Sequence, residues 1–331
     1  MSALLQVRGL TVELLSPVTS SDHPLTVVDE VSISLARGEA LGLVGESGSG
    51  KSTLLYALLG LLPSSMQEAR GEIIFDGRNL ALLTSKVRRR LAGSEIGVVF
   101  QEPTRSLNPV LRVGEQIAEV LRCHTSLNRK AAWTRAVELL DEVGIERASL
   151  RARDYPHQLS GGMNQRVMIA MAIACSPALL VADEPTTALD VTVQHEIMEL
   201  FVRLRADHNM ALLFVTHDLA LIQRQVDRVA VMYAGRIVEH GSVADVFEAP
   251  RHPYTRALLA CQPARASALA PIHEIGGSIP SIGNHPTGCA FHPRCEFAQA
   301  RCSVELPILE AKSRDHERAC FYPLDDPEVI E

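Results

Sequence analysis

The sequence predicts an α/β fold with a parallel or mixed sheet, followed by a small cysteine-rich region. Through the first ~250 residues, short apolar runs alternate with helical stretches, as in folds whose helices cover a sheet. A glycine-rich loop at 45–53 joins one such run to an apolar helical stretch. Four cysteines lie near the end of the chain, after a segment rich in Ala, Pro, Ser and Gly.

The expected elements follow from hydrophobic periodicity. The apolar runs predicted to form buried strands are 40–44, 96–100, 179–183, 211–216 and 228–233. The periodic segments predicted to form helices are 113–122, 131–143, 163–175 and 192–206. The stretch 260–288 breaks any period, and we expect a linker or an extended arm there.

Composition narrows the class of protein. The chain has 331 residues, of which 47% are hydrophobic, so a sizeable core is expected. Its formal net charge of -7 argues against a dedicated nucleic-acid binder, which usually carries a basic excess. The N-terminus lacks the pattern of a signal peptide, and no apolar run reaches the ~18–20 residues of a membrane-spanning helix. We therefore expect a cytosolic protein whose seven cysteines are buried, metal-binding or catalytic rather than disulfide-bonded.

The segment "GESGSGKST" fits the phosphate-loop pattern G-x-x-x-x-G-K-[ST] in the required context between a strand and a helix. Its residues are Gly45, Glu46, Ser47, Gly48, Ser49, Gly50, Lys51, Ser52 and Thr53. Glycines let successive backbone N–H groups point at phosphate oxygens, and the helix N-terminus favours negative charge. Lys51 is expected to neutralise the β- and γ-phosphates, and Ser52 to ligate Mg²⁺.

A second acidic segment completes the expected nucleotide site. The apolar run "LLVADEP" ends in Asp183 and Glu184, at a strand end where α/β sheets place ligands. Asp183 is expected to hold Mg²⁺, and Glu184 to polarise a water for attack on the γ-phosphate. Taken alone, the segment fits a solvated acidic turn equally well. The phosphate loop makes the catalytic interpretation the favoured one.

The segment "LSGGMNQR" (159–166) resembles the signature loop of ATP-binding-cassette (ABC) ATPases. Gln101 in "VVFQEP" is similar to the Q-loop glutamine, "TALD" (187–190) to the D-loop, and His217 in "VTHD" to the switch histidine. The resemblance implies a P-loop NTPase cassette. Such a cassette has a RecA-like core, an N-terminal antiparallel β-subdomain and an α-helical subdomain.

The resemblance also implies roles for individual residues and two cofactors, ATP and Mg²⁺. Glu184, His217 and Gln101 would be catalytic. Across a head-to-tail dimer, the partner's ATP would be contacted by Ser160, Gly161, Gly162 and Asp190.

Two positions depart from the family pattern. Met163 stands where many cassettes have Gln. The stretch "SSDHPLTVV" (20–28) has no aromatic residue to stack on adenine, which leaves His23 or Leu25 to cover the ring.

Further segments resemble the peptide and nickel importer branch of this family, closest to the D-type ATPase subunit. They are "SLNP" and "VGEQI" within 100–121, the stretch 168–194, and "APRHPYTRALL" (249–259). The resemblance implies a paralogous F-type ATPase partner, two transmembrane permease subunits and a periplasmic or extracellular peptide-binding protein. It implies a peripheral position at the cytoplasmic face of the inner membrane and no nucleic-acid partner. Dipeptide, oligopeptide, nickel chelate and glutathione all remain open as cargo, as do a homodimer and a heterodimer.

On the same basis the chain divides into two parts. Residues 1–258 would form the nucleotide-binding domain, with its helical subdomain at about 103–176. Residues 259–331 would form a C-terminal region typical of oligopeptide and dipeptide transporters.

The tail cysteines have the spacing C-x5-C-x6-C-x17-C. They are Cys289, Cys295, Cys302 and Cys320. Four thiols held by short loops suit an iron–sulfur cluster or Zn²⁺. Members of the resembled branch carry a [4Fe–4S] cluster on tail cysteines in this arrangement, so the resemblance favours the cluster. Zn²⁺ and unligated or disulfide-bonded thiols remain alternatives. In either metal form, ligation would supply folding free energy to a region with little core.

Two other classes of protein fit parts of the pattern. An ABC ATPase unlinked to transport usually carries two cassettes or a long coiled-coil insertion, and this sequence has neither. A metal-binding sensor with a vestigial ATPase conflicts with the full set of ATPase motifs.

Overall fold

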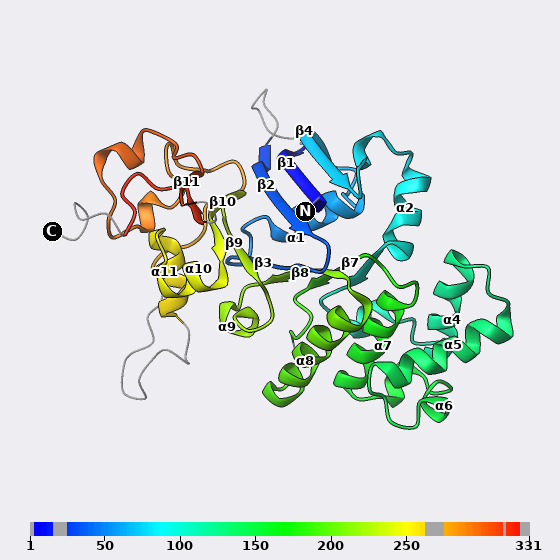
Figure 1. The fold of residues 1–331 in the computed structure, drawn as a ribbon. Helices are drawn as coiled ribbons and strands as arrows, with labels where there is room; N and C mark the ends of the chain where they lie inside the picture. Colours follow the sequence, from blue (N-terminus) through cyan, green and yellow to red (C-terminus); the bar gives the residue numbers. More distant parts are fainter. Residues whose placement is uncertain (1–2, 16–24, 188, 262–274, 314–315, 325–331) are drawn as a thin grey trace. The chain divides into compact units, whose positions relative to one another are not determined.

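The computed structural model describes residues 3–15, 25–187, 189–261, 275–313 and 316–324, which form two compact units (Figure 1). The first unit comprises Met1–Leu35, Ala40–Leu82 and Val215–Glu331. The second unit comprises Ala36–Glu39 and Leu83–Phe214. The phosphate loop and the tail cysteines belong to the first unit. The signature loop and the acidic strand end belong to the second.

The first unit contains a four-stranded sheet with the order β2-β1-β4-β5. Its strands are β1 (Ala3–Leu14), β2 (Leu25–Ala36), β4 (Met66–Phe75) and β5 (Arg78–Asn79). β4 runs antiparallel to both β1 and β5. Val31, Ile33 and Leu35 of β2 are buried at every second position, as expected for a strand with one face on the core.

A second sheet in this unit runs in the order β11-β12-β10-β9-β3. Its strands are β3 (Ala40–Val44), β9 (Arg228–Tyr233), β10 (Arg236–Ser242), β11 (Glu310–Ser313) and β12 (His316–Arg318). β3 is parallel to β9, and the other pairs are antiparallel. The helices of the unit are α1 (Lys51–Leu59), α9 (Leu219–Ile222), α10 (Val243–Glu248) and α11 (Pro253–Ala260), with 3₁₀ turns at Leu80–Leu82, His292–Arg294 and Ala300–Ser303. The cysteine-rich tail therefore contributes strands to the sheet that carries the phosphate loop.

In the second unit, β6 (Ile96–Val99) is parallel to β7 (Leu179–Asp183). β8 (Ala211–Thr216) lies next to β7 in the sheet. The boundary between the two units falls within β8, after Phe214. The helices are α2 (Ser85–Ser94), α3 (Pro103–Ser106), α4 (Val113–His124), α5 (Arg129–Glu142), α6 (Ala148–Arg151), α7 (Gly161–Ile173) and α8 (Val191–His208), with a 3₁₀ turn at Pro156–Gln158. α4, α5 and α7 pack on one another through apolar faces.

The predicted strands and helices are confirmed. Four of the strands have the predicted bounds, and the fifth is one residue shorter, at Ile96–Val99. Helices α5 and α8 begin before their first predicted residue because a polar side chain caps the N-terminus of each. Asn128 caps α5, and Asp190 caps α8. Residues 275–288 contain no helix or strand, as expected for an arm, while 262–274 lie outside the described residues.

Across the described residues, no helix has the length and apolar character needed to cross a bilayer.

Candidate nucleotide site

The phosphate loop connects the buried strand β3 to the helix α1. Gly45 is required by close packing, because a Cβ there would lie 2.1 Å from the carbonyl oxygen of Met232. Gly50 precedes α1 with φ 102, a left-handed conformation that suits glycine. Since Gly50 has no side chain to cap α1, the first backbone N–H groups of the helix are left to an anion.

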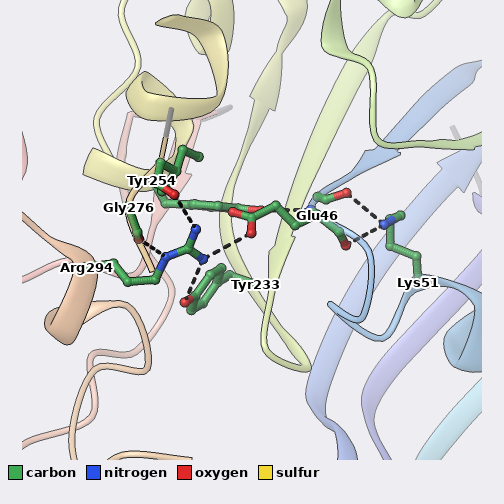
Figure 2. A network of polar contacts seen from close by, with 8 residues as sticks. Glu46, Lys51, Tyr233, Tyr254, Gly276 and Arg294 are labelled. Carbon is green, nitrogen blue, oxygen red and sulfur yellow. Dashed lines mark hydrogen bonds and ion pairs between the residues drawn. The ribbon is translucent and has the colours of Figure 1, made fainter. Parts of the chain in front are cut away.

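Lys51 organises the loop around its ammonium group (Figure 2). Its Nζ donates to the carbonyl oxygens of Gly45 at 2.7 Å and Glu46 at 2.9 Å, and contacts Ser49 Oγ at 3.3 Å. The side chain is buried, whereas Ser52 is exposed at the start of the helix. The cation is thus held inside the loop curve, where phosphate oxygens of a nucleotide would compete with the loop carbonyls for it.

In the second unit, the end of β7 carries the two predicted carboxylates. Asp183 is buried as the last residue of the strand. Glu184 follows with φ 43, a backbone conformation that non-glycine residues rarely adopt. Its Oε2 accepts hydrogen bonds from Gln101 Nε2 at 2.8 Å and from the Thr187 hydroxyl at 3.1 Å. The structure therefore brings the predicted catalytic carboxylate and the Q-loop glutamine together.

The signature loop begins α7, a helix of 13 residues. Ser160 caps it by accepting a hydrogen bond from the backbone N–H of Met163 at 3.3 Å. A Cβ on Gly162 would lie 2.7 Å from Val193, which is itself bonded through its N–H to the Asp190 carboxylate at 3.0 Å. Signature loop and D-loop are thus neighbours. Ser160, Gly161 and Asp190 are exposed, as contact with a partner requires. Ala188 of the D-loop lies outside the described residues.

His217 follows β8 in the first unit, and its side chain is exposed. The next residue, Asp218, caps α9 by accepting from the N–H of Ala220 at 2.8 Å. Of the two candidates for covering adenine, His23 lies outside the described residues. Leu25 is the first residue of β2 and is partly exposed.

The four tail cysteines line one small cavity in the first unit. The N–H of Cys289 donates to the carbonyl oxygen of Cys302 at 2.8 Å. Burial raises the pKa of Cys295 to about 11 and that of Cys320 to about 12, and the neighbouring cysteines add to both shifts. The free thiolates of Cys295 and Cys320 are therefore disfavoured, and a bound cation would have to compensate their negative charge.

The side chains around this cavity do not form a completed ligand set. Among the described residues, no group of three or more His, Cys, Asp and Glu side chains is arranged to hold a metal ion. The donor type and the shared cavity fit a thiolate-bound centre, although the described side chains do not form one.

Three site residues were missed by the sequence reasoning. Tyr254 belongs to the "HPY" segment that identified the importer branch, but nothing in its pattern shows that its hydroxyl contacts Glu46. Arg294 stands among the tail cysteines and pairs with the Glu46 carboxylate. Tyr233 ends β9 and accepts a hydrogen bond from Arg294. Each contact joins residues far apart in the chain, which leaves no local sequence signal.

Comparison with known proteins identifies the family. The profile described as "ABC transporter" matches residues 28–187. The profile described as "Oligopeptide/dipeptide transporter, C-terminal region" matches residues 238–302, a range that includes Tyr254 and Arg294.

Relatives match over nearly the whole chain. The dipeptide transport ATP-binding protein DppD of Escherichia coli (strain K12) is 45% identical over 324 residues, which cover 98% of either chain. The oligopeptide transport ATP-binding protein OppD of Salmonella typhimurium is 44% identical over 325 residues, covering 98% of this chain and 95% of that protein.

Solved structures agree with the fold. The dimeric ATP-binding cassette MJ0796 bound to ADP and Pi gives a TM-score of 0.63 at 27% identity, covering 72% of this chain and 98% of its own. The protein cbiO1 from Clostridium perfringens gives a TM-score of 0.64 at 28% identity, covering 75% and 92%.

Fold and site together define an ATPase cassette of the ABC transporter class. The chain belongs to the family of ATP-binding subunits of dipeptide and oligopeptide ABC importers. The cassette fold and the family expected from the motifs are thereby confirmed.

Proposed function

We propose that this chain binds and hydrolyses ATP to drive the uptake of dipeptides or oligopeptides through a membrane permease. The observation that supports ATP hydrolysis is the Gln101–Glu184 hydrogen bond. Glu184 directly follows the end of β7, and the hydrogen bond orients its carboxylate there. The names of the relatives DppD and OppD, at 45% and 44% identity, support peptides as the class of cargo.

In the cis half of the site, backbone N–H groups of the loop from Gly45 to Thr53 cradle the phosphates. Lys51 would neutralise their charge, and Ser52 and Asp183 are the residues that would hold Mg²⁺. Three further side chains are assigned to the reaction: Glu184 would polarise the attacking water, Gln101 would hold that carboxylate through their hydrogen bond, and His217 would contact the γ-phosphate.

In the trans half, an ATPase partner presents its own nucleotide to the signature loop. Ser160, Gly161 and Gly162 offer the N-terminal end of α7 to the partner's γ-phosphate, and Asp190 lies beside them. The dimeric state of the related cassette MJ0796 supports this arrangement. The partner is a paralogous F-type subunit.

The full assembly adds two transmembrane permease subunits and an external peptide-binding protein, which place this chain at the cytoplasmic face of the inner membrane as a peripheral subunit. Residues 1–258 act as the nucleotide-binding domain, with the helical subdomain at about 103–176 facing the permease. Residues 259–331 are the C-terminal region of the peptide-importer branch, supported by the profile match at 238–302.

The tail cysteines are the residues that would hold a [4Fe–4S] cluster, with Zn²⁺ as the alternative. Supporting this, Cys289, Cys295, Cys302 and Cys320 line one cavity. Burial raises the pKa of the Cys289, Cys295 and Cys320 thiols, so their thiolates would need a compensating cation. When bound, the group ties together a region with little apolar core.

The proposal is tested on the complete transporter in vesicles, with ATP hydrolysis measured as peptide-loaded binding protein is added. We expect dipeptide or oligopeptide to stimulate hydrolysis, and Lys51→Ala to abolish it. Stimulation by nickel chelate or glutathione instead would overturn the peptide assignment. Unchanged hydrolysis in Lys51→Ala would overturn the assigned ATP site.

A further inference from the structure

Glu46, the second residue of the phosphate loop, is held through its backbone N–H, its carbonyl oxygen and one carboxylate oxygen (Figure 2). Its backbone N–H donates to the Tyr254 hydroxyl at 2.9 Å, and its carbonyl oxygen accepts from Lys51 at 2.9 Å. Its carboxylate Oε2 pairs with Arg294 Nη1 at 3.1 Å. Lys51 contacts the backbone of Glu46 and Arg294 contacts its carboxylate. Glu46 therefore connects the cysteine-rich tail to the Lys51 ammonium group of the phosphate loop.

The guanidinium of Arg294 is fixed in place by its surroundings. Its side chain is only 6% exposed. Its Nε donates to the carbonyl oxygen of Gly276 at 2.8 Å, Nη2 donates to that of Ile275 at 3.3 Å, and Nη1 also donates to the Tyr233 hydroxyl at 3.3 Å. A planar donor group with several fixed acceptors is typical of an arginine that orients another charge rather than of a solvated one.

The Glu46 carboxylate depends on this cation. Its side chain is 27% exposed, and its Oε1 is buried with no hydrogen-bond partner among the described residues. Removing the partner of a largely buried ion pair leaves an uncompensated charge, which costs more than the pair itself contributes. Here that charge would be negative and would lie beside the site of a polyphosphate anion.

The connection reaches the cysteines through a packed aromatic cluster. Arg294 directly precedes Cys295, and Phe291 lies two residues after Cys289. The ring of Phe291 packs against Tyr233 and Tyr254 at centroid distances of 5.2 and 5.3 Å. The segment that carries the cysteines is therefore packed rigidly against the residues that hold Glu46.

We propose that Arg294 is a positioning residue for ATP binding, which neutralises and orients Glu46 and so keeps the phosphate loop in its anion-binding form. The inference rests on the proposed role of that loop in holding ATP. It gives the C-terminal region a direct effect on nucleotide affinity in its own chain. The effect falls on binding rather than on the chemical step, because the hydrogen bonds of Arg294 go to Glu46, Tyr233 and two backbone carbonyls, none of which is assigned to that step.

The test compares full-length wild-type chain with Arg294→Gln, Glu46→Gln and the double variant, using Mg·ATP as the probe. Binding is measured by calorimetry and hydrolysis by steady-state kinetics. We expect Arg294→Gln to raise Kd and KM roughly tenfold with kcat within about twofold, as an unpaired charge near the phosphates requires. The double variant should recover most of the affinity, because two neutral amides can hydrogen-bond and no charge is left unpaired.

Arg301→Gln is the matched control. Arg301 precedes Cys302 as Arg294 precedes Cys295, but it is exposed and pairs with Glu305. Its replacement should leave Kd and KM unchanged. Arg294→Lys retains the charge without the planar fork, and we expect it to raise KM only about threefold. This variant carries the test if Arg294→Gln does not fold.

A purely structural role for Arg294 would lower the active fraction and kcat together while KM stayed at the wild-type value, and that result would overturn the inference. Lys51→Ala distinguishes a failure of the inference about Arg294 from a failure of the proposed function. If Lys51→Ala still binds ATP normally, the assignment of the ATP site fails. If Lys51→Ala abolishes binding while Arg294→Gln and Arg294→Lys bind as wild type, the role of Arg294 alone fails.

Discussion

Gln101 and Glu184, 83 positions apart in the chain, are joined by a side-chain hydrogen bond of 2.8 Å. The carboxylate oxygen that accepts it also accepts from the Thr187 hydroxyl. Glu184 reaches both donors from a left-handed backbone with φ 43, a conformation that stores strain and often marks functional residues. The carboxylate is therefore oriented by its backbone and by two hydrogen-bond donors.

We expect Glu184→Gln to leave Mg·ATP affinity within about twofold of wild type and to lower kcat by ~10²–10⁴, because an amide does not accept a proton from the attacking water. Nucleotide titration and steady-state hydrolysis on the same preparation measure the two effects. Glu199→Gln is a suitable control, since Glu199 is exposed on α8 and pairs with His195. Wild-type turnover in Glu184→Gln would refute the catalytic assignment.

Ser160→Asp separates the capping role of Ser160 from its proposed trans role. Asp is as good an N-cap as Ser, so the thermal midpoint should not fall. ATP-dependent dimerisation and hydrolysis should be lost, because the new carboxylate would face the partner's γ-phosphate. Ser160→Ala should show the opposite balance, with about 1 kcal/mol less stability and weakened but measurable dimerisation. Light scattering with and without ATP reads out the dimer, and normal ATP-dependent dimerisation of Ser160→Asp would exclude the trans role.

The pH dependence of stability should depend on His252, whose Nδ1 accepts from the Tyr254 N–H at 3.0 Å and so caps α11. Burial lowers the pKa of His252 to about 4 from an ordinary value of 6.5, although the nearby Glu239 carboxylate opposes the shift. Below pH 6.5 the unfolded chain gains a proton that the folded chain does not bind until about pH 4. The free energy of unfolding should therefore be at its full value above this window and fall across it as the pH drops, by at most on the order of 3 kcal/mol.

Denaturant midpoints of wild type and His252→Asn, compared at several pH values, check this expectation. Asn can still cap α11 but does not titrate, so the variant should lose less stability between pH 6.5 and about 4. Equal pH dependence in the two proteins would show that His252 is not the responsible group.

Anaerobically purified protein should contain iron and acid-labile sulfide at about four each per chain, with the visible absorption of a [4Fe–4S] cluster. Cys295→Ser should lose most of both. Cys175→Ser should keep them, because Cys175 lies in the second unit and not among the cavity-lining cysteines. Stoichiometric zinc would show that the cysteines bind Zn²⁺ and not an iron–sulfur cluster. If neither metal is found, the tail thiols are unligated.

Much of the fold could be predicted from the sequence because its central strands are apolar along their whole length. β3, β7 and β8 are buried at every position, and such runs are conspicuous without any tertiary information. Helix ends were predicted less well, since Asn128 and Asp190 are polar residues outside the apolar period that start their helices through side-chain caps.

The residues of the candidate site likewise divide into those that the sequence predicts and those that it does not. The phosphate loop, Glu184 and Ser160 lie in short segments whose local chemistry reveals them. The partners of Glu46 do not, because Tyr254 and Arg294 reach it from 208 and 248 positions away, through contacts that only the folded chain creates. The cysteine spacing likewise predicted a shared location for the thiols, but spacing alone carries no information about how closely their sulfur atoms approach.

The pairing of β12 with β10 has a practical consequence for recombinant work on this chain. β10 lies between β9 and β12, and the wholly buried carboxylate of Glu239 in β10 accepts a hydrogen bond from His316 in β12. Cutting the chain near residue 260 would bare the backbone edge of β10 and uncover that carboxylate. An unprotected strand edge recruits other chains, so a shortened protein should aggregate rather than serve as a minimal cassette. Soluble fragments for crystallisation should therefore extend through Leu324, whose N–H donates to the carbonyl oxygen of Arg251 at 3.0 Å.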